Sequence, residues 1–358
     1  MIGILLASAL VLTPGCDLEH PSGEGACSRA QVDRLPINRL QVVGSHNSYK
    51  QAIAPAEMAL VRAVQPKLAA TLDYAHAPLA SELEMGARQL ELDILNDPKG
   101  GLFATPLAQK LAGDAASAPY DASQMGVPGF KVLHVQDIDY RSSCARFVQC
   151  LTDIRTWSKA HSDHVPILIL LNLKDDNLKG LPGTVSILPF DAQAMDAIDA
   201  EIRSVFPAQA LITPGSVQKG GRLAWPRLKA ARGKVMFALD ESPEKVALYR
   251  GRRHRLEGRV MFVNTDPGSP AAGYITLNEP VADARAISRA LARGVIVRTR
   301  ADADTAEARA NDGRRREAAL ASGAQYVSTD YLTPDLRFGP YHVGLPGGLV
   351  ARANPVVK

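Results

Sequence analysis

The chain has 358 residues, of which 46% are hydrophobic and 22% are charged, and its formal net charge is +4. This composition is typical of a soluble globular protein and excludes disorder for most of the chain. The length suits one large α/β barrel or two smaller domains. So small a positive charge predicts no nucleic-acid partner. The basic runs 252–255 and 314–316 are interpreted as solvent-exposed loop and helix surfaces rather than as a binding site for an anionic surface.

The amino-terminal residues resemble an export signal. Residues 2–12 form an apolar segment, which is too short to cross a bilayer because a spanning helix needs about 20 apolar residues. We therefore predict a signal peptide over residues 1–16, although the usual basic start is missing. Gly15-Cys16 also resembles the end of a bacterial lipobox, so lipid attachment at Cys16 is an open alternative. We expect a secreted, periplasmic or cell-envelope lipoprotein.

Four cysteines fit an exported protein, because oxidising compartments permit disulfide bonds. Cys144 and Cys150 are a natural pair, but within one helix they would be about 9 Å apart along the axis, beyond disulfide reach. The bond therefore requires Cys144 to lie in the loop before the helix that carries Cys150. Cys16 either pairs with Cys27 or is lipidated and leaves Cys27 free. No cysteine spacing indicates a zinc site.

Eight runs along the chain have the composition of strands, and several are almost wholly apolar, as expected for parallel strands buried on both faces. They are 40–45, 88–95, 131–135, 166–174, 234–240, 260–264, 294–300 and 326–331. Helical patterns lie between them, and those at 191–206, 282–293 and 305–322 are the clearest. The last two end at Gly294 and Gly323, where glycine commonly closes a helix.

This alternation predicts a TIM-type (β/α)8 barrel, an α/β fold in a single domain. The long stretch 96–130 is interpreted as an irregular loop over one end of the barrel rather than a domain linker. We expect a monomer in which four segments follow one another: the signal peptide 1–16, an N-terminal segment 17–37, the barrel 38–345 and a C-terminal tail 346–358.

Polar side chains gather where these strands end. In such barrels catalytic groups lie at the carboxyl ends of the strands. The candidates are His46, Asn47, Glu91, Asp93 and His134, and on later strands Asp240, Asn264, Arg298, Arg300 and Asp330. Two adjacent buried carboxylates repel unless a cation or shared proton relieves them, so Glu91 and Asp93 favour metal binding over a solvated strand face. Lys174 needs a function or a carboxylate partner if buried. Arg298 and Asp330 are interpreted first as a pair across the rim.

At this point the sequence resembles a known family. His46-Asn47-Ser48-Tyr49, Glu91-Leu92-Asp93, Leu133-His134 and the segment 323–331 are similar to motifs of the calcium-dependent phosphatidylinositol-specific phospholipases C, particularly the bacterial branch. The resemblance covers roughly residues 38–345 and again implies a TIM-type barrel. It also implies phospholipid or inositol-phosphate headgroup substrates and a peripheral membrane contact.

The resemblance implies a role for each motif residue. His46 and His134 would act on the phosphodiester, one stabilising charge on the phosphoryl oxygens and the other protonating the leaving oxygen. Asn47, Glu91 and Asp93 would bind Ca²⁺, with Mg²⁺ as the alternative, because hard cations prefer oxygen ligands. Glu91 or a neighbouring carboxylate would take the proton of the inositol 2-hydroxyl.

One position departs from the family pattern. Animal enzymes carry a further Glu ligand on the fourth strand, and the matching residue here is Asn172. A neutral amide would weaken Ca²⁺ binding, unless Asp175 or Asp176 takes its place. Lys174 is then assigned to substrate binding, together with Arg298 and Asp330.

Three alternatives remain open from the sequence. A glycerophosphodiester phosphodiesterase or sphingomyelinase D type barrel also uses two His residues and a Glu-x-Asp pair with Mg²⁺, although His46-Asn47-Ser48-Tyr49 does not match the His-Arg-Gly of the former. A secreted binding barrel would keep the pocket without turnover. A surface-anchored interaction protein would depend on Cys16 and the basic runs instead.

Overall fold

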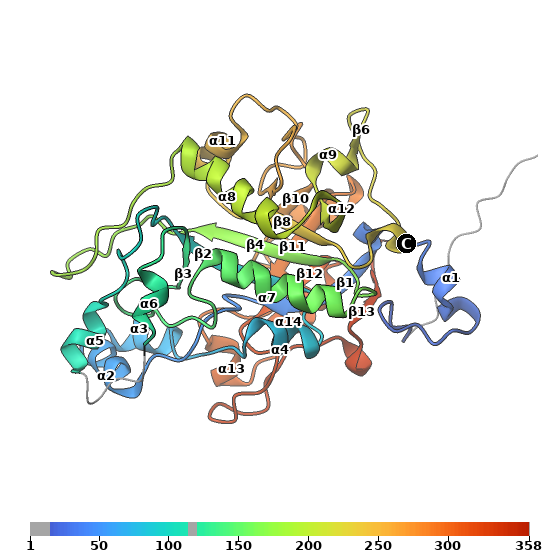
Figure 1. The fold of residues 1–358 in the computed structure, drawn as a ribbon. Helices are drawn as coiled ribbons and strands as arrows, with labels where there is room; N and C mark the ends of the chain where they lie inside the picture. Colours follow the sequence, from blue (N-terminus) through green and yellow to red (C-terminus); the bar gives the residue numbers. More distant parts are fainter. Residues whose placement is uncertain (1–14, 114–119, 358) are drawn as a thin grey trace, which may run out of the picture.

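The centre of the molecule is a ring of parallel strands whose carboxyl ends point the same way. The computed structural model describes residues 15–113 and 120–357, so most of the predicted signal peptide lies outside the described residues. The ring strands are β1 (Leu40–Ser45), β2 (Gln89–Leu95), β4 (Ile167–Leu173), β8 (Val235–Leu239), β9 (Phe262–Val263), β10 (Tyr274–Thr276), β11 (Ile296–Arg300) and β12 (Tyr326–Thr329). Figure 1 shows them between surrounding helices, with the predicted α/β alternation.

Two sheets make up this ring. One has the order β10-β11-β12-β1-β13, and the other has the order β3-β2-β4-β8-β5 with β9 also on β8. At one seam the Arg88 amide donates to the Val43 carbonyl at 2.9 Å, which connects β2 with β1. At the other seam an isolated bridge joins Asn264 to Tyr274, and so β9 to β10. The ring is therefore assembled from two sheets and is not one uninterrupted barrel sheet.

Gly44 explains how closely β1 and β2 approach at their seam. A Cβ atom at this position would lie 2.1 Å from the Gln89 carbonyl oxygen, so no larger residue fits without moving a strand. The close approach places the carboxyl end of β1 beside the first residues of β2, so His46, which follows β1, lies near Glu91 within β2.

Seven of the eight predicted strand runs overlap ring strands, but the run 131–135 was wrong as a barrel strand. Only β3 (Lys131–Val132) forms there, and it pairs antiparallel with β2 near Ile94. β2 pairs directly with β4 instead. The eighth ring strand is the three-residue β10, which is too short to show a recognisable pattern.

Helices cover the outside of the ring. α7 (Phe147–Ala160) and α8 (Ala192–Val205) pack with β2, β4 and β8 in the largest apolar cluster (Figure 1). The predicted helices at 191–206 and 282–293 are confirmed as α8 and α12 (Ala284–Ala292). The predicted helix 305–322 is divided into α13 (Ala306–Ala310) and α14 (Arg314–Ala321), because Asn311 adopts a left-handed conformation.

The loops at the carboxyl side contain short helices that border the candidate site. α2 (Pro55–Val64) and α3 (Pro66–Thr71) follow β1, and α4 (Leu79–Glu84) leads into β2. The predicted irregular stretch 96–130 contains α5 (Leu107–Ala112) and α6 (Ala122–Met125). The remaining elements are η1 (Gly25–Cys27), α1 (Arg29–Val32), η2 (Ile37–Arg39), η3 (Ala208–Ala210), β5 (Leu211–Ile212), α9 (Pro214–Val217), β6 (Gln218–Lys219), β7 (Arg222–Leu223), α10 (Leu228–Ala231), α11 (Pro243–Arg250), η4 (Pro346–Gly348) and β13 (Ala351–Ala353).

Two disulfide bonds cross-link the described part of the chain. Cys144 bonds to Cys150, with Cys144 in the loop before α7, as the sequence required. Cys16 bonds to Cys27, and a sulfur in this disulfide cannot at the same time carry a lipid thioether. β13 pairs antiparallel with β1, so part of the predicted tail lies on the sheet. Within the described residues, no helix is both long enough and apolar enough to span a membrane.

Candidate active site

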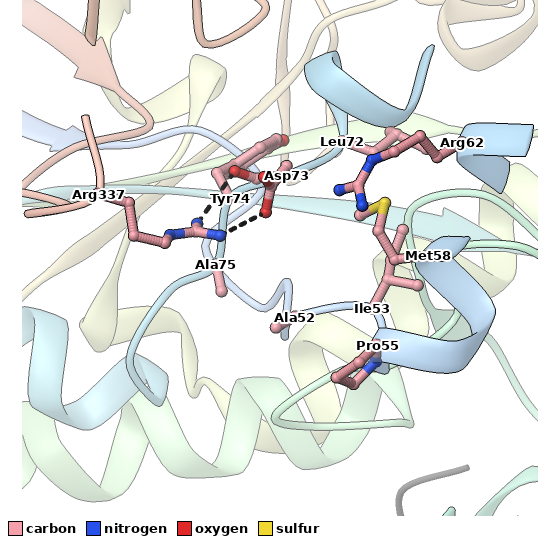
Figure 2. Close-up of a pocket in the computed structure, with 10 residues that line it drawn as sticks. All are labelled: Ala52, Ile53, Pro55, Met58, Arg62, Leu72, Asp73, Tyr74, Ala75 and Arg337. Atoms are coloured by element: carbon pink, nitrogen blue, oxygen red, sulfur yellow. Dashed lines mark hydrogen bonds and ion pairs between the residues drawn. The ribbon is translucent and has the colours of Figure 1, made fainter. Parts of the chain in front are cut away.

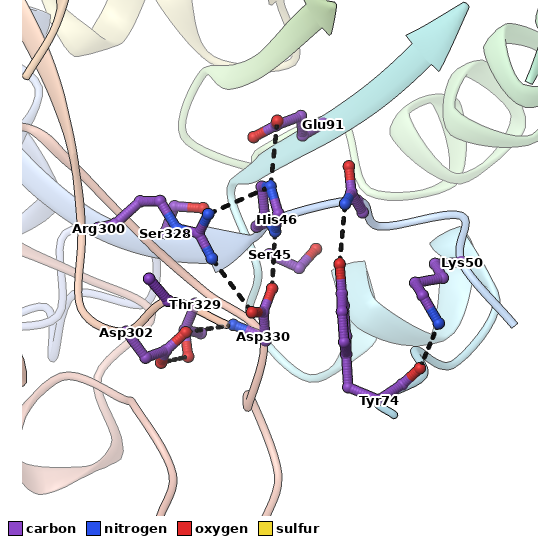
Figure 3. Close-up of polar contacts among 12 residues, drawn as sticks. Ser45, His46, Lys50, Tyr74, Glu91, Arg300, Asp302, Ser328, Thr329 and Asp330 are labelled. Atoms are coloured by element: carbon purple, nitrogen blue, oxygen red, sulfur yellow. Dashed lines mark hydrogen bonds and ion pairs between the residues drawn. The ribbon is translucent and has the colours of Figure 1, made fainter. Parts of the chain in front are cut away.

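His46 follows directly from β1 and is held by partners from the far end of the chain (Figure 3). Its backbone amide donates to the Thr329 carbonyl at 2.9 Å. Its Nδ1 lies 2.7 Å from Asp330 Oδ1, and Arg300 Nη2 lies 3.1 Å from Asp330 Oδ2. Its Nε2 lies 3.7 Å from Glu91 Oε1 and 3.4 Å from Arg300 Nη1. The imidazole is therefore fixed on one side and open to reaction at Nε2.

Electrostatics define the protonation of this pair. Burial, together with the Arg300 guanidinium, lowers the pKa of His46 well below its usual value. Burial opposes ionisation of Asp330, but His46 and Arg300 hold the pKa of that carboxyl below its usual range. A neutral imidazole beside a carboxylate must donate from Nδ1, so Nε2 is left as a proton acceptor.

A second carboxyl group lies behind Asp330. Asp302 is fully buried and accepts hydrogen bonds from the Thr329 hydroxyl, the Asp330 amide at 2.8 Å and the Tyr341 hydroxyl at 3.2 Å. Burial and the neighbouring Asp330 charge raise the pKa of Asp302 to about 7. Only one of these two carboxyls is fully ionised at neutral pH.

Glu91 lies within β2 and is paired with Arg298 from β11. The Glu91 Oε2 atom lies 2.6 Å from Arg298 Nη2, and the same guanidinium donates to Asn278 Oδ1 and Ser328 Oγ. Burial raises the pKa of Glu91 to about 7 despite the opposing Arg298 charge, and the Asp93 charge adds to the effect. A carboxyl with this pKa can accept and release a proton near neutral pH.

The oxygens needed to bind a hard cation are present but have few partners. Asn47 donates from Nδ2 to the Tyr74 hydroxyl at 2.8 Å, while its buried Oδ1 has no hydrogen-bond partner among the described residues. The Asp93 carboxylate is buried and meets one cation, Lys174 Nζ, at 3.0 Å. Buried oxygens without partners are costly, and a cation with oxygen ligands would satisfy them.

Asn172 lies beside Asp93, because these two residues face each other in the β2–β4 register. It is half-buried. The described part of the chain holds no cluster of three or more His, Cys, Asp or Glu side chains arranged as a metal cage. A cation here would therefore depend on the mixed set of Asn47, Glu91 and Asp93, to which Asn172 can add an amide oxygen.

His134 has a matching support of its own. Its Nδ1 lies 2.7 Å from Asp139 Oδ2, and the same oxygen lies 3.3 Å from Lys50 Nζ. Lys50 and Asp139 are buried, and Lys50 also donates to the backbone carbonyls of Leu72 and Tyr74. His134 keeps 16% of its side chain exposed. Both imidazoles thus have a carboxylate on Nδ1, and Nε2 of His46 also lies near Arg300 Nη1 and Glu91 Oε1.

Tyr74 connects the surroundings of the two histidines. Its hydroxyl accepts from Asn47, its ring stacks near His46 with centroids 6.4 Å apart, and Lys50 lies over it at 4.5 Å. A cleft of about 400 Å³ opens on the outer side of this residue, between α2 and Arg337, whose guanidinium bonds Asp73 (Figure 2). Tyr74 therefore separates this outer cleft from the catalytic candidates.

Comparison with known proteins decides the family. The family model described as phosphoinositide phospholipase C, Ca²⁺-dependent, matches residues 35–355, which is most of the chain. The chain belongs to this family. Its members are phosphatidylinositol-specific phospholipases C, which are phosphoric diester hydrolases, and the predicted resemblance is confirmed.

Solved structures agree on the fold. A calcium-dependent phosphoinositol-specific phospholipase C from Pseudomonas sp. has 17% identity and a TM-score of 0.52, over 89% of this chain and 96% of its own. Another structure of the calcium-dependent Pseudomonas sp. enzyme, in its apo form, has 17% identity and a TM-score of 0.51, over 89% of this chain and 95% of its own. The TIM-type fold predicted from the strand count is confirmed. No curated protein sequence matches the chain.

Two sequence interpretations within the site change. Arg298 and Asp330 do not pair with each other: Arg298 binds Glu91, and Arg300 binds Asp330. Arg298 and Arg300 point to the same face of β11, but they lie two residues apart along the strand, so each guanidinium group meets a different carboxylate. Lys174 has the carboxylate partner that its burial required, Asp93.

Several supporting residues escaped the sequence analysis. Asp139 lies five residues after His134. An acidic residue this close to the histidine, together with Lys50 beside the His46 motif, was the signal that could have identified it. Asp302 lies two residues beyond Arg300, in a loop with no pattern to mark it. Tyr74 gave no signal, because it lies in a loop before α4 with no motif around it.

Proposed function

We propose that the family's reaction, phosphodiester cleavage of phosphatidylinositol-like lipids, is carried by His46, which follows β1, Glu91, which lies within β2, and His134, which follows β3. The observation that carries this assignment is the pair of imidazoles, each with Nδ1 on a buried carboxylate, so that Nε2 is the nitrogen available to exchange a proton. Glu91, whose pKa is about 7, lies 3.7 Å from His46 and is available as the proton acceptor.

The bond changes follow from these positions. The inositol 2-hydroxyl gives its proton to Glu91, and its oxygen attacks phosphorus. The bond from phosphorus to the diacylglycerol oxygen breaks, and that oxygen takes the proton from His134 Nε2. His46 and Arg300 contact the phosphoryl oxygens, and an anionic phosphate opposite the neutral His46 favours its protonation. Asp139 and Asp330 hold the two rings in position.

Ca²⁺ is the cation we assign to this site, in agreement with the family, and Mg²⁺ is the alternative. Asn47, Glu91 and Asp93 would hold it, with Asn172 as a further ligand. When bound, it would lower the pKa of a substrate hydroxyl and offset phosphate charge. Because Arg298 and Lys174 already pair with Glu91 and Asp93, these two cations must share or release their carboxylates when the metal binds. Lys174 and Arg298 are then free to contact substrate phosphate or hydroxyl groups.

Release of water-soluble inositol phosphate from labelled phosphatidylinositol tests this assignment, with and without EGTA. We expect His46→Ala and His134→Ala each to lower the rate by about 10²-fold or more, as for loss of an acid–base group. His342→Ala is the matched control, because His342 is exposed and bonds only a backbone carbonyl. Wild-type rates in both histidine variants, or a rate that EGTA leaves unchanged, would contradict the mechanism.

The substrate is a membrane lipid, and one rim of the site has the surface to meet a membrane. An apolar groove of about 310 Å³ lies between α2, α3, α5 and residues 178–181, all on the carboxyl side of the strands (Figure 1). Val64 is 75% exposed and Leu111 is 64% exposed in this groove. Exposed apolar patches of this kind commonly mark interaction sites.

The groove is bordered by cations that lack partners. Arg62, Lys67, Lys110 and Lys179 are exposed, and none forms an ion pair with another described residue. An anionic lipid bilayer complements this arrangement, since apolar side chains enter the interface and basic side chains meet the headgroups. We therefore place the bilayer at this rim, which brings the mouth of the active site to the lipid surface.

A double substitution tests the membrane contact. Val64→Asp with Leu111→Asp should weaken binding to phosphatidylglycerol vesicles by at least about tenfold while hydrolysis of a monomeric short-chain phosphatidylinositol continues. Val356→Asp is the control, because Val356 is also exposed but lies near β13 at the other side of the ring. Unchanged vesicle binding by the double variant would exclude this rim as the contact.

Export is part of the proposal. The two disulfides support an oxidising compartment, and the apolar amino-terminal segment would direct the chain there, with any cleavage before Cys16 because Cys16 bonds to Cys27. Since Cys16 is in a disulfide, we favour a secreted or periplasmic monomer over a lipid-anchored form. Mass spectrometry of the mature protein would detect an acyl thioether at Cys16 if the anchored form were correct.

A further inference from the structure

A second cleft, of about 550 Å³, lies at the end of the ring opposite the catalytic residues. The β6–β7 hairpin, residues 267–272 and residues 293–295 enclose it, next to the amino ends of β10 and β11. Its apolar lining includes Leu223, Ala272 and Val295. Figure 1 shows β6 and α9 far from α2 and α5, which border the active site. The cleft shares no lining residue with the catalytic group.

Three arginines from separate segments converge on this cleft. Arg222 belongs to β7, Arg255 to the basic run after α11, and Arg293 to the turn before β11. All three are exposed, and their guanidinium groups make no hydrogen bond or ion pair within residues 15–113 and 120–357. By contrast, Arg232 and Arg259 bond carboxylates. The basic run, interpreted from the sequence as a solvated face, thus contributes to a concave site.

No carboxylate is among the described residues that line the cleft, and the two acidic residues nearest in sequence accept hydrogen bonds from backbone amides beside it. Asp266 accepts from the Gly268 amide at 2.7 Å, and Glu257 accepts from the backbone amide of Arg255 at 3.0 Å. Three arginines outnumber the two carboxylates beside them, Asp266 and Glu257, and none of the three forms an ion pair with them in the described part of the chain, so an anion in the cleft would relieve the remaining repulsion. The arrangement favours a negatively charged ligand.

Glycines leave room for two of these guanidinium groups. A Cβ atom on Gly268 would lie 3.1 Å from Arg293 Nη1 and 2.9 Å from Asp266 Oδ1, so a side chain at this position would displace Arg293. A Cβ atom on Gly221, where φ is +80°, would lie 3.6 Å from Arg255 Nη2. At both glycines the absence of a side chain therefore leaves space beside the guanidinium group.

We propose that this arginine cleft, defined by Arg222, Arg255 and Arg293, binds a small soluble ligand that carries at least two phosphate or sulfate groups. Guanidinium groups suit these anions because their planar N–H pairs match the oxygens. The volume is within the usual range for small-molecule sites, and the apolar lining can contact the ligand body. A soluble ligand fits better than a lipid, since the bilayer lies at the opposite end in the proposed function.

Pyrophosphate binding in EDTA, measured by calorimetry at low salt, tests the proposal. The test variant is Arg222→Gln/Arg255→Gln/Arg293→Gln. The control is Arg34→Gln/Arg227→Gln/Arg285→Gln, which removes the same charge from exposed arginines that neither line the cleft nor form ion pairs with other described residues. We expect the control to bind like wild type. The test variant should lose one equivalent, or bind at least about tenfold more weakly, equivalent to about 1.4 kcal/mol.

Three outcomes would overturn the proposal. The test variant could keep wild-type affinity and stoichiometry, or the control could lose as much affinity, which would indicate net charge alone. The arginines could instead be needed for phosphatidylglycerol vesicles but not for pyrophosphate, which would identify a lipid surface. Phosphatidylinositol hydrolysis should be unchanged in both variants, so this result is separate from any failure of the proposed function.

Discussion

Asp139 gives the sharpest test of how the fold prepares His134. Asp139 Oδ2 is 2.7 Å from His134 Nδ1 and 3.3 Å from Lys50 Nζ, whereas Asp139 Oδ1 is buried without a hydrogen-bond partner among the described residues. In Asp139→Asn, the amide oxygen can occupy the place of Oδ2 and keep both contacts, with the NH₂ group at the empty position. The substitution therefore removes the charge and keeps the shape.

Two magnitudes follow from this geometry. A charge-assisted hydrogen bond contributes about 1.5–3 kcal/mol and a neutral one about 0.5–1.5 kcal/mol, so the imidazolium loses roughly 1.4 kcal/mol of support, or about tenfold in kcat. Lys50 is left buried without a counter-charge, which costs about 3 kcal/mol of unfolding free energy. Asp139→Ala, which also removes the hydrogen bond, should lower kcat by about 10²-fold.

A double variant separates the catalytic role from the structural one. Lys50→Met removes the unpaired charge, and replacing a buried ion pair by apolar groups is often neutral or stabilising. Lys50→Met/Asp139→Asn should therefore regain most of the unfolding free energy, measured in urea, but keep the tenfold loss of kcat. Asp137→Asn is the control in the same loop, because Asp137 accepts only backbone amides. Wild-type kcat in Asp139→Asn, or recovery of kcat in the double variant, would refute the reasoning.

Three further predictions concern the disulfide, the buried acid and the departure from the family pattern. Cys144→Ser/Cys150→Ser should lower the unfolding free energy in urea by about 2 kcal/mol, because the bond closes a short loop, and unchanged stability would mean that it is dispensable. Asp302 has its folded pKa raised to about 7, so its contribution to stability is full below its unfolded pKa and is lost as the pH rises through 7. Relative to wild type, Asp302→Asn should therefore gain stability between pH 5 and pH 8 in urea unfolding, and a flat difference would contradict that pKa. Asn172→Glu should lower the Ca²⁺ concentration for half-maximal activity by about tenfold, because it adds a charged ligand beside Asp93, and an unchanged Ca²⁺ requirement would place Asn172 outside the site.

The architecture was predictable where burial leaves a pattern in the sequence. β4 is apolar on both faces, and α8 repeats its apolar residues with helical spacing, so both were found from the sequence. β10 has three residues and partly exposed side chains, and its place in the ring comes from its neighbours β9 and β11. The run 131–135 had a strand pattern, but the direction in which a short strand pairs is decided by the chain that precedes it.

The structure brings together the residues that the sequence analysis proposed as reacting groups, whereas most contacts that support them were not predicted. His46, Glu91 and His134 could be identified because each lies in or after a recognisable strand and belongs to a family motif. Their partners Asp330 and Arg298 lie 284 and 207 residues away, and only the closing of the ring brings them into contact. Which arginine meets which carboxylate depends on strand register and depth, and a two-residue difference separates Arg298 from Arg300.

There is a physical reason why the proposed reacting residues were easier to predict than the residues that support them. The proposed reacting residues lie in or just after strand-like runs, so the sequence pattern marks them. Residues that support them need only fill buried space with the right charge, and many positions can do so. Lys50 is an example. It is next to the family motif, but it contacts Asp139, which lies 89 positions later, and the same Asp139 carboxylate also contacts His134. Tyr74 contacts both Lys50 and Asn47, so a change at Tyr74 should disturb the proposed metal ligand Asn47 and the proposed proton donor His134 together.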